Sequence, residues 1–87
     1  MTDVSTILSE REKVHGSFAG NALVFWGLHE TVEAAPNWAG MTPAMRLSVI
    51  MILSKLSRVL SGNPREPDHW VDIAGYATLV ARELSGQ

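Results

Sequence analysis

The side chains best suited to chemistry in this 87-residue chain are charged groups set among apolar residues. Lys55 and Arg58 stand three positions apart. Further along the chain, His69, Asp72 and Tyr76 follow one another at spacings of three and four. Such spacings place side chains on one face of a helix. If the two helices pair antiparallel across the short loop between them, Asp72 can reach Lys55 or Arg58.

Two interpretations of this polar face stay open. In the first, a salt bridge and hydrogen bonds fix the register of the two helices. In the second, the face binds a small anion or phosphate, with His69 and Tyr76 beside it. Arg58 then offers a planar fork of donors and Lys55 a point charge.

A pair of carboxylates forms a second candidate site. Glu30 and Glu33 make a Glu-x-x-Glu pair, and His29 lies four positions before Glu33, so these side chains could share a divalent metal. The pair resembles the all-α nucleotide pyrophosphohydrolases of the MazG-like type, which carry Glu-x-x-Glu on one helix and Glu-x-x-Asp on the next. That resemblance implies a magnesium site with four carboxylates, since hard cations take oxygen ligands. The other interpretation is a solvated acidic edge of the helix.

The second half of that ligand set is replaced in this sequence. The next helix offers Lys55-x-x-Arg58 followed by a serine, and two positive charges facing a metal oppose its binding. Asp68 and Asp72 compensate only if their helix faces the glutamate pair. We therefore expect no cofactor and favour a non-enzymatic role, with magnesium bound only if the pyrophosphohydrolase resemblance holds.

The remaining reactive residue types are scattered along the chain. His15, His29 and His69 lie in different elements, where a single histidine is typical of a cap or a surface position, and cysteine is absent. Neither a Gly-x-Ser-x-Gly elbow nor a phosphate-binding glycine-rich loop is present. Trp26 lies off the apolar stripe of its helix, and Trp38 is the one large residue of a loop, where it should cover the rim of the core. These two tryptophans are the candidates for contacting a protein partner.

The elements that must position these residues are helices. Apolar residues recur at helical spacing, and no strand alternation bounded by turn signals is present. We predict an all-α bundle of about four helices, over residues 4–14, 18–34, 43–61 and 68–84, in a single domain over residues 1–87. The clearest start is Thr42 before Pro43, and Asp68 is the expected cap of the last helix. Gly16 should end the first helix in the left-handed conformation.

The helix over residues 43–61 is apolar around most of its circumference. Such a helix is buried on most sides. A compact monomer of this length has a radius of gyration of about 12 Å and offers few elements to cover it. A second copy of the chain is the simplest cover, so we expect dimerisation to complete the bundle. The expected core stripes of the helices include Val4, Ile7, Leu8, Phe18, Phe25, Met45, Val49, Leu56, Leu60, Trp70 and Leu84.

Composition and charge narrow the class of partner. The formal net charge is -2 and the sequence pI ≈ 5.8, without the clustered Lys and Arg of a nucleic-acid-binding surface. Arg46, Lys55 and Arg58 interrupt the most apolar stretch and argue against a membrane span. The N-terminus lacks the pattern of a signal peptide. The absence of cysteine fits a reducing cytosol, so we expect a cytoplasmic protein.

Motifs over most of the chain resemble a family of small, uncharacterised phage and prophage proteins. The motifs are His15-Gly16-Ser17-Phe18 with Asn21, Lys55-x-x-Arg58 with Gly62, and Asp68-x-Trp70-x-Asp72-Ile73-x-Gly75-Tyr76. The resemblance implies a helical protein of phage or prophage origin, although a tyrosine is more usual where His15 stands. We favour an accessory protein that is a homodimer and binds a host or phage protein, for example as an inhibitor of defence. The alternatives are a MazG-like nucleotide-binding protein or pyrophosphohydrolase, and a structural helical module.

Overall fold

The computed structural model describes residues 3–86, and over this range the chain is all-helical. Its elements are α1 (Val4–His15), α2 (Phe18–Ala34), the short 3-10 helix η1 (Trp38–Gly40), α3 (Pro43–Ser61) and α4 (Pro67–Leu84). The predicted fold class is therefore confirmed. The predicted bounds of the second and third helices coincide with α2 and α3, and α1 is one residue longer than predicted.

Local capping signals explain where α2 and α3 begin. The hydroxyl oxygen of Ser17 accepts a hydrogen bond from the Gly20 amide at 3.0 Å, and that of Thr42 accepts one from the Met45 amide at 3.2 Å. These side chains satisfy amide groups that have no partner within the first turn of a helix. Pro43 follows Thr42 at the first helical position, where its missing amide proton is not needed.

Two local predictions were wrong. The last helix begins at Pro67, with Glu66 as its N-cap residue, so Asp68 lies inside the first turn and is not the cap. Pro67 is preorganised for the first helical position, and this preference moves the start one residue earlier. Gly16 has φ 81° and ψ 177°, so it is extended with a positive φ and not in the left-handed helical conformation. Only glycine adopts this region readily.

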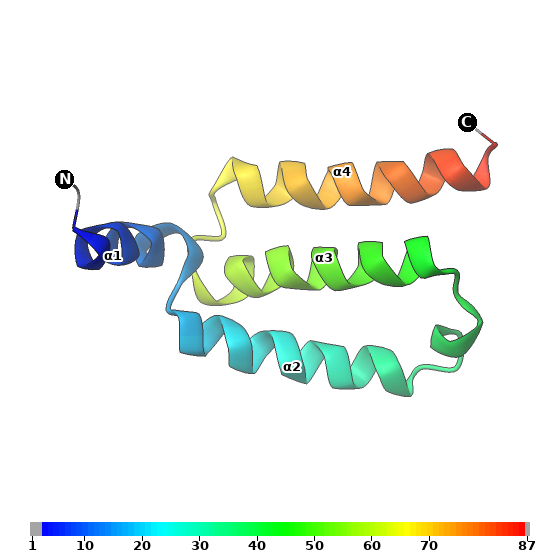
Figure 1. Cartoon of the computed structure of the whole chain (residues 1–87), viewed down its shortest axis with the longest axis horizontal. Coiled ribbons are helices and arrows are strands. Elements are labelled where there is room, and N and C mark those ends of the chain that lie inside the picture. Colours follow the sequence, from blue (N-terminus) through cyan, green and yellow to red (C-terminus); the bar gives the residue numbers. More distant parts are fainter. Residues whose placement is uncertain (1–2, 87) are drawn as a thin grey trace.

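The helices α2, α3 and α4 pack side by side as a small, bundle-like layer. Helix α3 lies between α2 and α4, runs antiparallel to both and packs against both (Figure 1). Helix α1 projects from one end of the layer. The Cα radius of gyration is 15.0 Å, well above the roughly 12 Å of a compact monomer of this length. None of the helices in the described range is both long and apolar enough to cross a membrane.

The core of this layer is very thin. Among residues 3–86, Leu53 and Val59 are the buried hydrophobic residues, and the other buried positions are Ser48, Ser57 and His69. Several residues expected in the core are exposed, because within residues 3–86 no other helix covers them. They are Val4, Ile7, Leu8, Phe18, Leu60, Trp70 and Leu84.

The connection between α2 and α3 is held by Trp38. Its ring is half-buried, as expected for a residue covering the rim of the core, and the Arg46 guanidinium carbon lies 5.6 Å from the ring centroid. The Arg46 Nε also donates a hydrogen bond to the Trp38 carbonyl oxygen at 3.1 Å. This loop, predicted without regular structure, is therefore an ordered 3-10 turn fixed by a cation–π contact.

Candidate functional site

Two glycines bring the ends of all four helices together. The turn between α1 and α2 crosses the turn between α3 and α4 at Gly16 and Gly62, which we call the glycine joint. A Cβ atom placed on Gly62 would lie 2.6 Å from the Gly16 amide nitrogen and 2.6 Å from the Val14 carbonyl oxygen. A Cβ atom on Gly16 would collide with the backbone of Ser61. The backbones therefore approach each other too closely for any side chain.

Hydrogen bonds fasten the glycine joint from both sides. The Val14 carbonyl oxygen accepts from the Asn63 amide at 2.9 Å and from His69 Nε2 at 3.2 Å. The Asn21 side-chain amide donates to the His15 carbonyl oxygen at 2.6 Å, and the Ser61 hydroxyl donates to Asn21 Oδ1 at 2.8 Å. Buried polar groups need such partners, so this network fixes how α1, α2, α3 and α4 meet.

The joint places two histidines side by side. His69 is only 1% exposed, and its ring centroid lies 5.2 Å from that of His15. Burial lowers the pKa of His15 below its usual value of 6.5, and the positive charge of Arg58 and the neighbouring His69 lower it further. His15 is therefore neutral near pH 7. Histidines taken one by one as caps or surface residues gave no sign of this pairing, because their contact is made across the fold.

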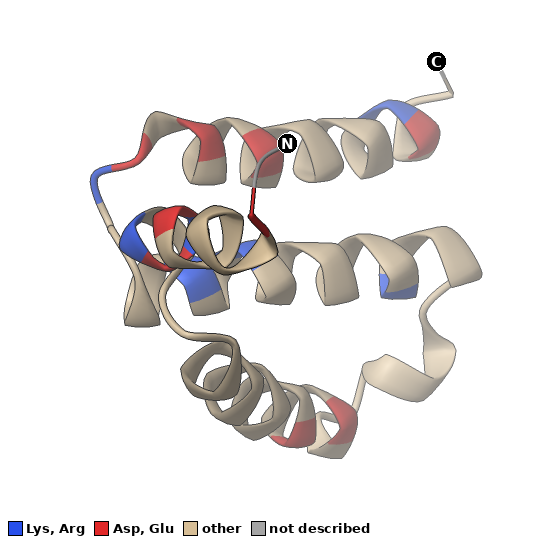
Figure 2. Ribbon diagram, turned by 60° about the vertical axis from the view of Figure 1, so that its left-hand side comes forward, with Lys and Arg blue, Asp and Glu red and all other residues tan. Residues whose placement is uncertain are grey.

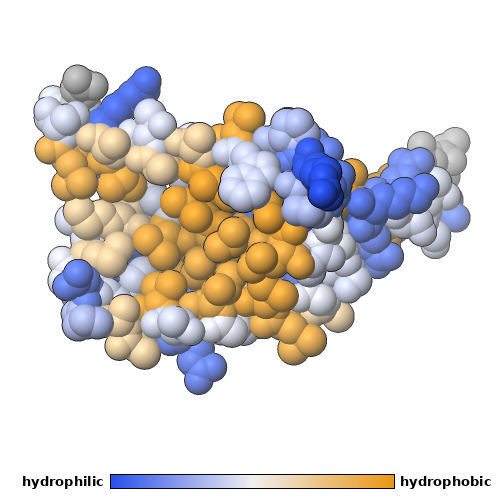
Figure 3. Space-filling view, turned by 180° about the vertical axis from the view of Figure 1, so that it is seen from behind, coloured by the Kyte–Doolittle hydropathy of each residue, from blue (hydrophilic) through white to orange (hydrophobic). Residues whose placement is uncertain are grey.

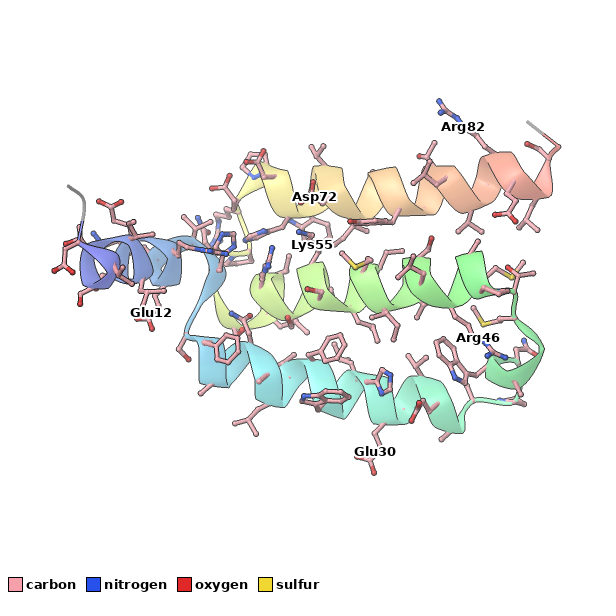
Figure 4. All side chains as sticks on the ribbon, viewed as in Figure 1. Glu12, Glu30, Arg46, Lys55, Asp72 and Arg82 are labelled. Carbon is pink, nitrogen blue, oxygen red and sulfur yellow. The ribbon has the colours of Figure 1, made fainter. Side chains whose placement is uncertain are left out.

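The predicted polar face between α3 and α4 is formed only in part. Lys55 Nζ lies 3.2 Å from Asp72 Oδ2, and the two side chains point toward each other across the gap between the helices (Figure 4). Arg58 forms no ion pair or side-chain hydrogen bond with any residue from 3 to 86, and Tyr76 is half-buried without a side-chain hydrogen bond in that range. The contacts agree with the first interpretation, a salt bridge between the helices.

Arg58 instead lines a cleft between α1, α2 and α3. The cleft has a volume of about 510 Å³. Its polar wall includes Arg11, Arg58 and Asn21, and its apolar wall includes the rings of Phe25 and Trp26. Charged residues gather at this end of the molecule, around α1 and the start of α4, whereas the rest of the layer carries few charges (Figure 2). The cleft therefore has both charged and aromatic walls.

The family model for a domain of unknown function (DUF6378) matches residues 2–84. The chain belongs to this family. The matched range includes all four helices, the glycine joint and the cleft, so the DUF6378 domain accounts for every feature described so far. No curated protein and no solved structure matches the chain.

The glutamate pair lies apart from this end of the DUF6378 domain. Glu30 and Glu33 are exposed on α2, and Glu30 points away from α3 (Figure 4). His29 Nδ1 lies 3.8 Å from the Glu33 carboxylate. The helix that carries Asp68 and Asp72 packs on the opposite side of α3, so it does not face the glutamates. Within residues 3–86, no three acidic or histidine side chains are grouped closely enough to hold a metal.

The two candidate tryptophans differ in their surroundings. Trp26 is 62% exposed and packs edge-on against Phe25, with ring centroids 5.1 Å apart. It stands in the apolar wall of the cleft. Trp38, in contrast, is held by Arg46 and lies 6.4 Å from the His29 ring. Trp26 is therefore the more accessible of the two rings in this DUF6378 protein.

Proposed function

We propose that this DUF6378 protein is a non-catalytic binding protein that acts as a homodimer. The observation that carries the proposal is the large surface of the single chain, on which many large hydrophobic side chains are exposed. The solvent-accessible surface is 6169 Å², whereas a compact monomer of 9.5 kDa exposes about 5,000 Å². The excess, roughly 1,100 Å², is comparable to the surface of about 800 Å² that each partner buries in a standard interface.

The excess surface includes one continuous apolar region. Figure 3 shows apolar side chains covering the middle of the side of the layer that faces away from the viewer in Figure 1. On α3, spacings of four and seven place Met45, Val49, Leu56 and Leu60 on one side of the helix. We call this side the apolar face. Leu60 is 60% exposed, and burying such residues supplies the main driving force for association.

A second copy suits this face better than water or a small ligand. The face belongs to a molecule whose principal extents are 46 × 29 × 24 Å. Two such molecules packed with their layers face to face give each α3 the cover that its sequence requires. A small domain buries a smaller fraction of its surface than a large one, and oligomerisation is one way to compensate for a thin core. Homodimers of this kind commonly have twofold symmetry.

The role of such a dimer is inferred from the sequence motifs. The resemblance to small phage and prophage proteins supports an accessory protein that binds a host or phage protein, for example a component of host defence. The Lys55–Asp72 ion pair supports a structural role for Asp72, one of the carboxylates that a pyrophosphohydrolase site in this chain would need for its metal. These observations favour binding over catalysis in a cytoplasmic protein of a bacterial host.

Light scattering coupled to size-exclusion chromatography tests the dimer. The wild-type protein should have twice the chain mass of 9.5 kDa. Leu60→Glu should give the monomer, because it would bury an unpaired charge in an apolar interface. Leu47→Glu is the matched control, since Leu47 is equally exposed at 62% on the same helix. The two positions are thirteen residues apart along the helix, a spacing that turns Leu47 well away from the apolar face.

Three results would contradict the proposal. A wild-type protein that is monomeric at 100 µM would leave the apolar face without the proposed partner. A dimer that survives Leu60→Glu but dissociates with Leu47→Glu would place the interface on the other side of the layer. A magnesium-dependent rise in melting temperature with one nucleoside triphosphate would support the pyrophosphohydrolase alternative instead.

A further inference from the structure

We propose that the cleft between α1, α2 and α3 binds a small anion that carries an aromatic ring. The inference does not depend on the homodimer. Arg58 and Leu60 are two residues apart on α3, and such residues point to nearly opposite sides of a helix. The cleft therefore opens on the side of the layer away from the apolar face.

The apolar wall of the cleft is aromatic. Phe18, Phe25 and Trp26 line it from α2. Phe18 is 87% exposed, and Trp26 presents its ring to solvent while Phe25 supports it edge-on. Aromatic rings stack on one another with offset or edge-to-face geometry and bury a large area for few rotatable bonds. A flat, unsaturated ring is therefore the ligand group that this wall accommodates best.

The opposite wall carries an unused positive charge. Arg58 is half-buried and forms no ion pair within residues 3–86, although Lys55, one turn earlier, is already paired with Asp72. A partly desolvated guanidinium is most stable beside an anion, and its planar donors fit a carboxylate or phosphate. Arg58 therefore provides the site for the charged end of the ligand.

The other charges around the cleft preserve this positive potential. Arg11 and Glu12 both line it from α1, and Figure 4 shows Glu12 on the side of α1 toward α2. With Arg58 these residues leave one net positive charge, since His15 is neutral near pH 7. The excess cation selects anions over neutral or positively charged rings.

The size of the cleft favours a small molecule. Its volume of about 510 Å³ lies within the range of 300–1,000 Å³ typical of small-molecule sites. The projecting helix α1 forms a third wall beside α2 and α3. Together these walls combine aromatic and aliphatic side chains with several polar groups that can orient a ligand.

Isothermal titration calorimetry with matched probes tests the site. The aromatic anions are adenosine 5′-monophosphate and indole-3-acetate, which distinguish a phosphate from a carboxylate ligand. Adenosine and indole-3-acetamide are the neutral controls, and inorganic phosphate and acetate are the controls without a ring. At least one aromatic anion should bind about tenfold more tightly than both its neutral control and its control without a ring. The neutral control lacks the charge-assisted hydrogen bond to Arg58, and the other control lacks the ring contact with the aromatic wall.

Variants then assign the binding to the cleft. Arg58→Gln and Trp26→Ala should each weaken the bound aromatic anion about tenfold. Arg82→Gln is the charge-matched control, because Arg82 points away from α4 at the far end of the layer (Figure 4). Circular dichroism checks that each variant is folded, and Arg11→Gln replaces Arg58→Gln if the latter does not fold.

Two outcomes would overturn the inference. The first is a wild-type protein that binds neither aromatic anion better than its controls. The second is binding that Arg58→Gln, or its replacement Arg11→Gln, leaves unchanged. Light scattering on the same samples reports the dimer separately, so failure of the ligand site and failure of the proposed homodimer can be distinguished.

Discussion

The glycine joint allows a sharp test of how the fold is held together. Gly62→Ala adds a single methyl group where the nearest atoms belong to the backbone of residues 14–16. Backbone cannot rotate aside as a flexible side chain can, so the two crossing turns must separate. We expect this substitution to be among the most destabilising in the chain, despite its small chemical size.

The magnitude follows from the contacts that the added methyl group disturbs. Overpacking of this kind costs about 1–3 kcal/mol. Separating the turns also weakens the two hydrogen bonds to the Val14 carbonyl oxygen, from the Asn63 amide and from His69 Nε2, at about 1 kcal/mol each. The free energy of unfolding should therefore fall by roughly 3–5 kcal/mol. A domain of this kind has only about 5–15 kcal/mol in total.

Urea denaturation followed by far-ultraviolet circular dichroism measures this change. Protein concentration must be held constant, because dimerisation makes apparent stability concentration-dependent. Gly27→Ala is the matched control, since a Cβ atom there would meet nothing within 4 Å. In the interior of α2 it should raise stability by up to about 1 kcal/mol. If Gly62→Ala loses less than about 1 kcal/mol, or behaves like Gly27→Ala, the argument for a tight backbone crossing is refuted.

Three further predictions concern the polar contacts. Lys55→Ala and Asp72→Ala should each lower the free energy of unfolding by about 0.5–1 kcal/mol, a small effect because the ion pair is partly exposed. Unchanged melting temperatures in both variants would show that the pair does not stabilise the fold. Stability should decrease as the pH falls below 6.5, because burial and then Arg58 lower the pKa of folded His15, so the unfolded chain binds the proton first. His15→Gln should reduce this dependence in urea titrations from pH 7 to pH 5, and an identical slope would exclude His15 as its source. Asn21→Ala should lower the free energy of unfolding by about 1–3 kcal/mol, since the His15 carbonyl oxygen and the Ser61 hydroxyl each lose a hydrogen-bond partner. A melting temperature within about 2 °C of the wild-type value would contradict this prediction.

Helix boundaries were predictable where the sequence carries a local signal. Ser17 and Thr42 each cap the helix that follows, and both helices begin where expected. The start of α4 was misplaced because Asp68 and Pro67 are competing signals one residue apart. Local signals therefore determine the elements to within a residue, since capping depends only on neighbours in the chain.

The arrangement of the candidate site was less predictable. Helical spacing showed that Lys55 and Arg58 share one face of α3 and that Asp72 on α4 could pair with either of them. The rotation of α3 about its own axis decides which of the two cations reaches Asp72. That rotation depends on packing against α2 and α4, which no local pattern records. The same limit applies to His15 and His69, whose contact depends on the glycine joint.

The apolar stripes were predicted correctly as patterns but not as a core. Leu60 and Trp70 fall on the expected stripes, yet both are exposed in the single chain. Periodicity indicates that a side of a helix requires cover, without identifying the element that covers it.

The position of α3 between its two sequence neighbours has a kinetic consequence. Each of the pairs α2–α3 and α3–α4 is a helical hairpin, so its contacts form between nearby parts of the chain, and such topologies fold rapidly. The glycine joint instead links Val14 to Asn63 and His69, and we expect it to close after the hairpins. Gly62→Ala should then have a φ-value near zero, with faster unfolding and a nearly unchanged folding rate.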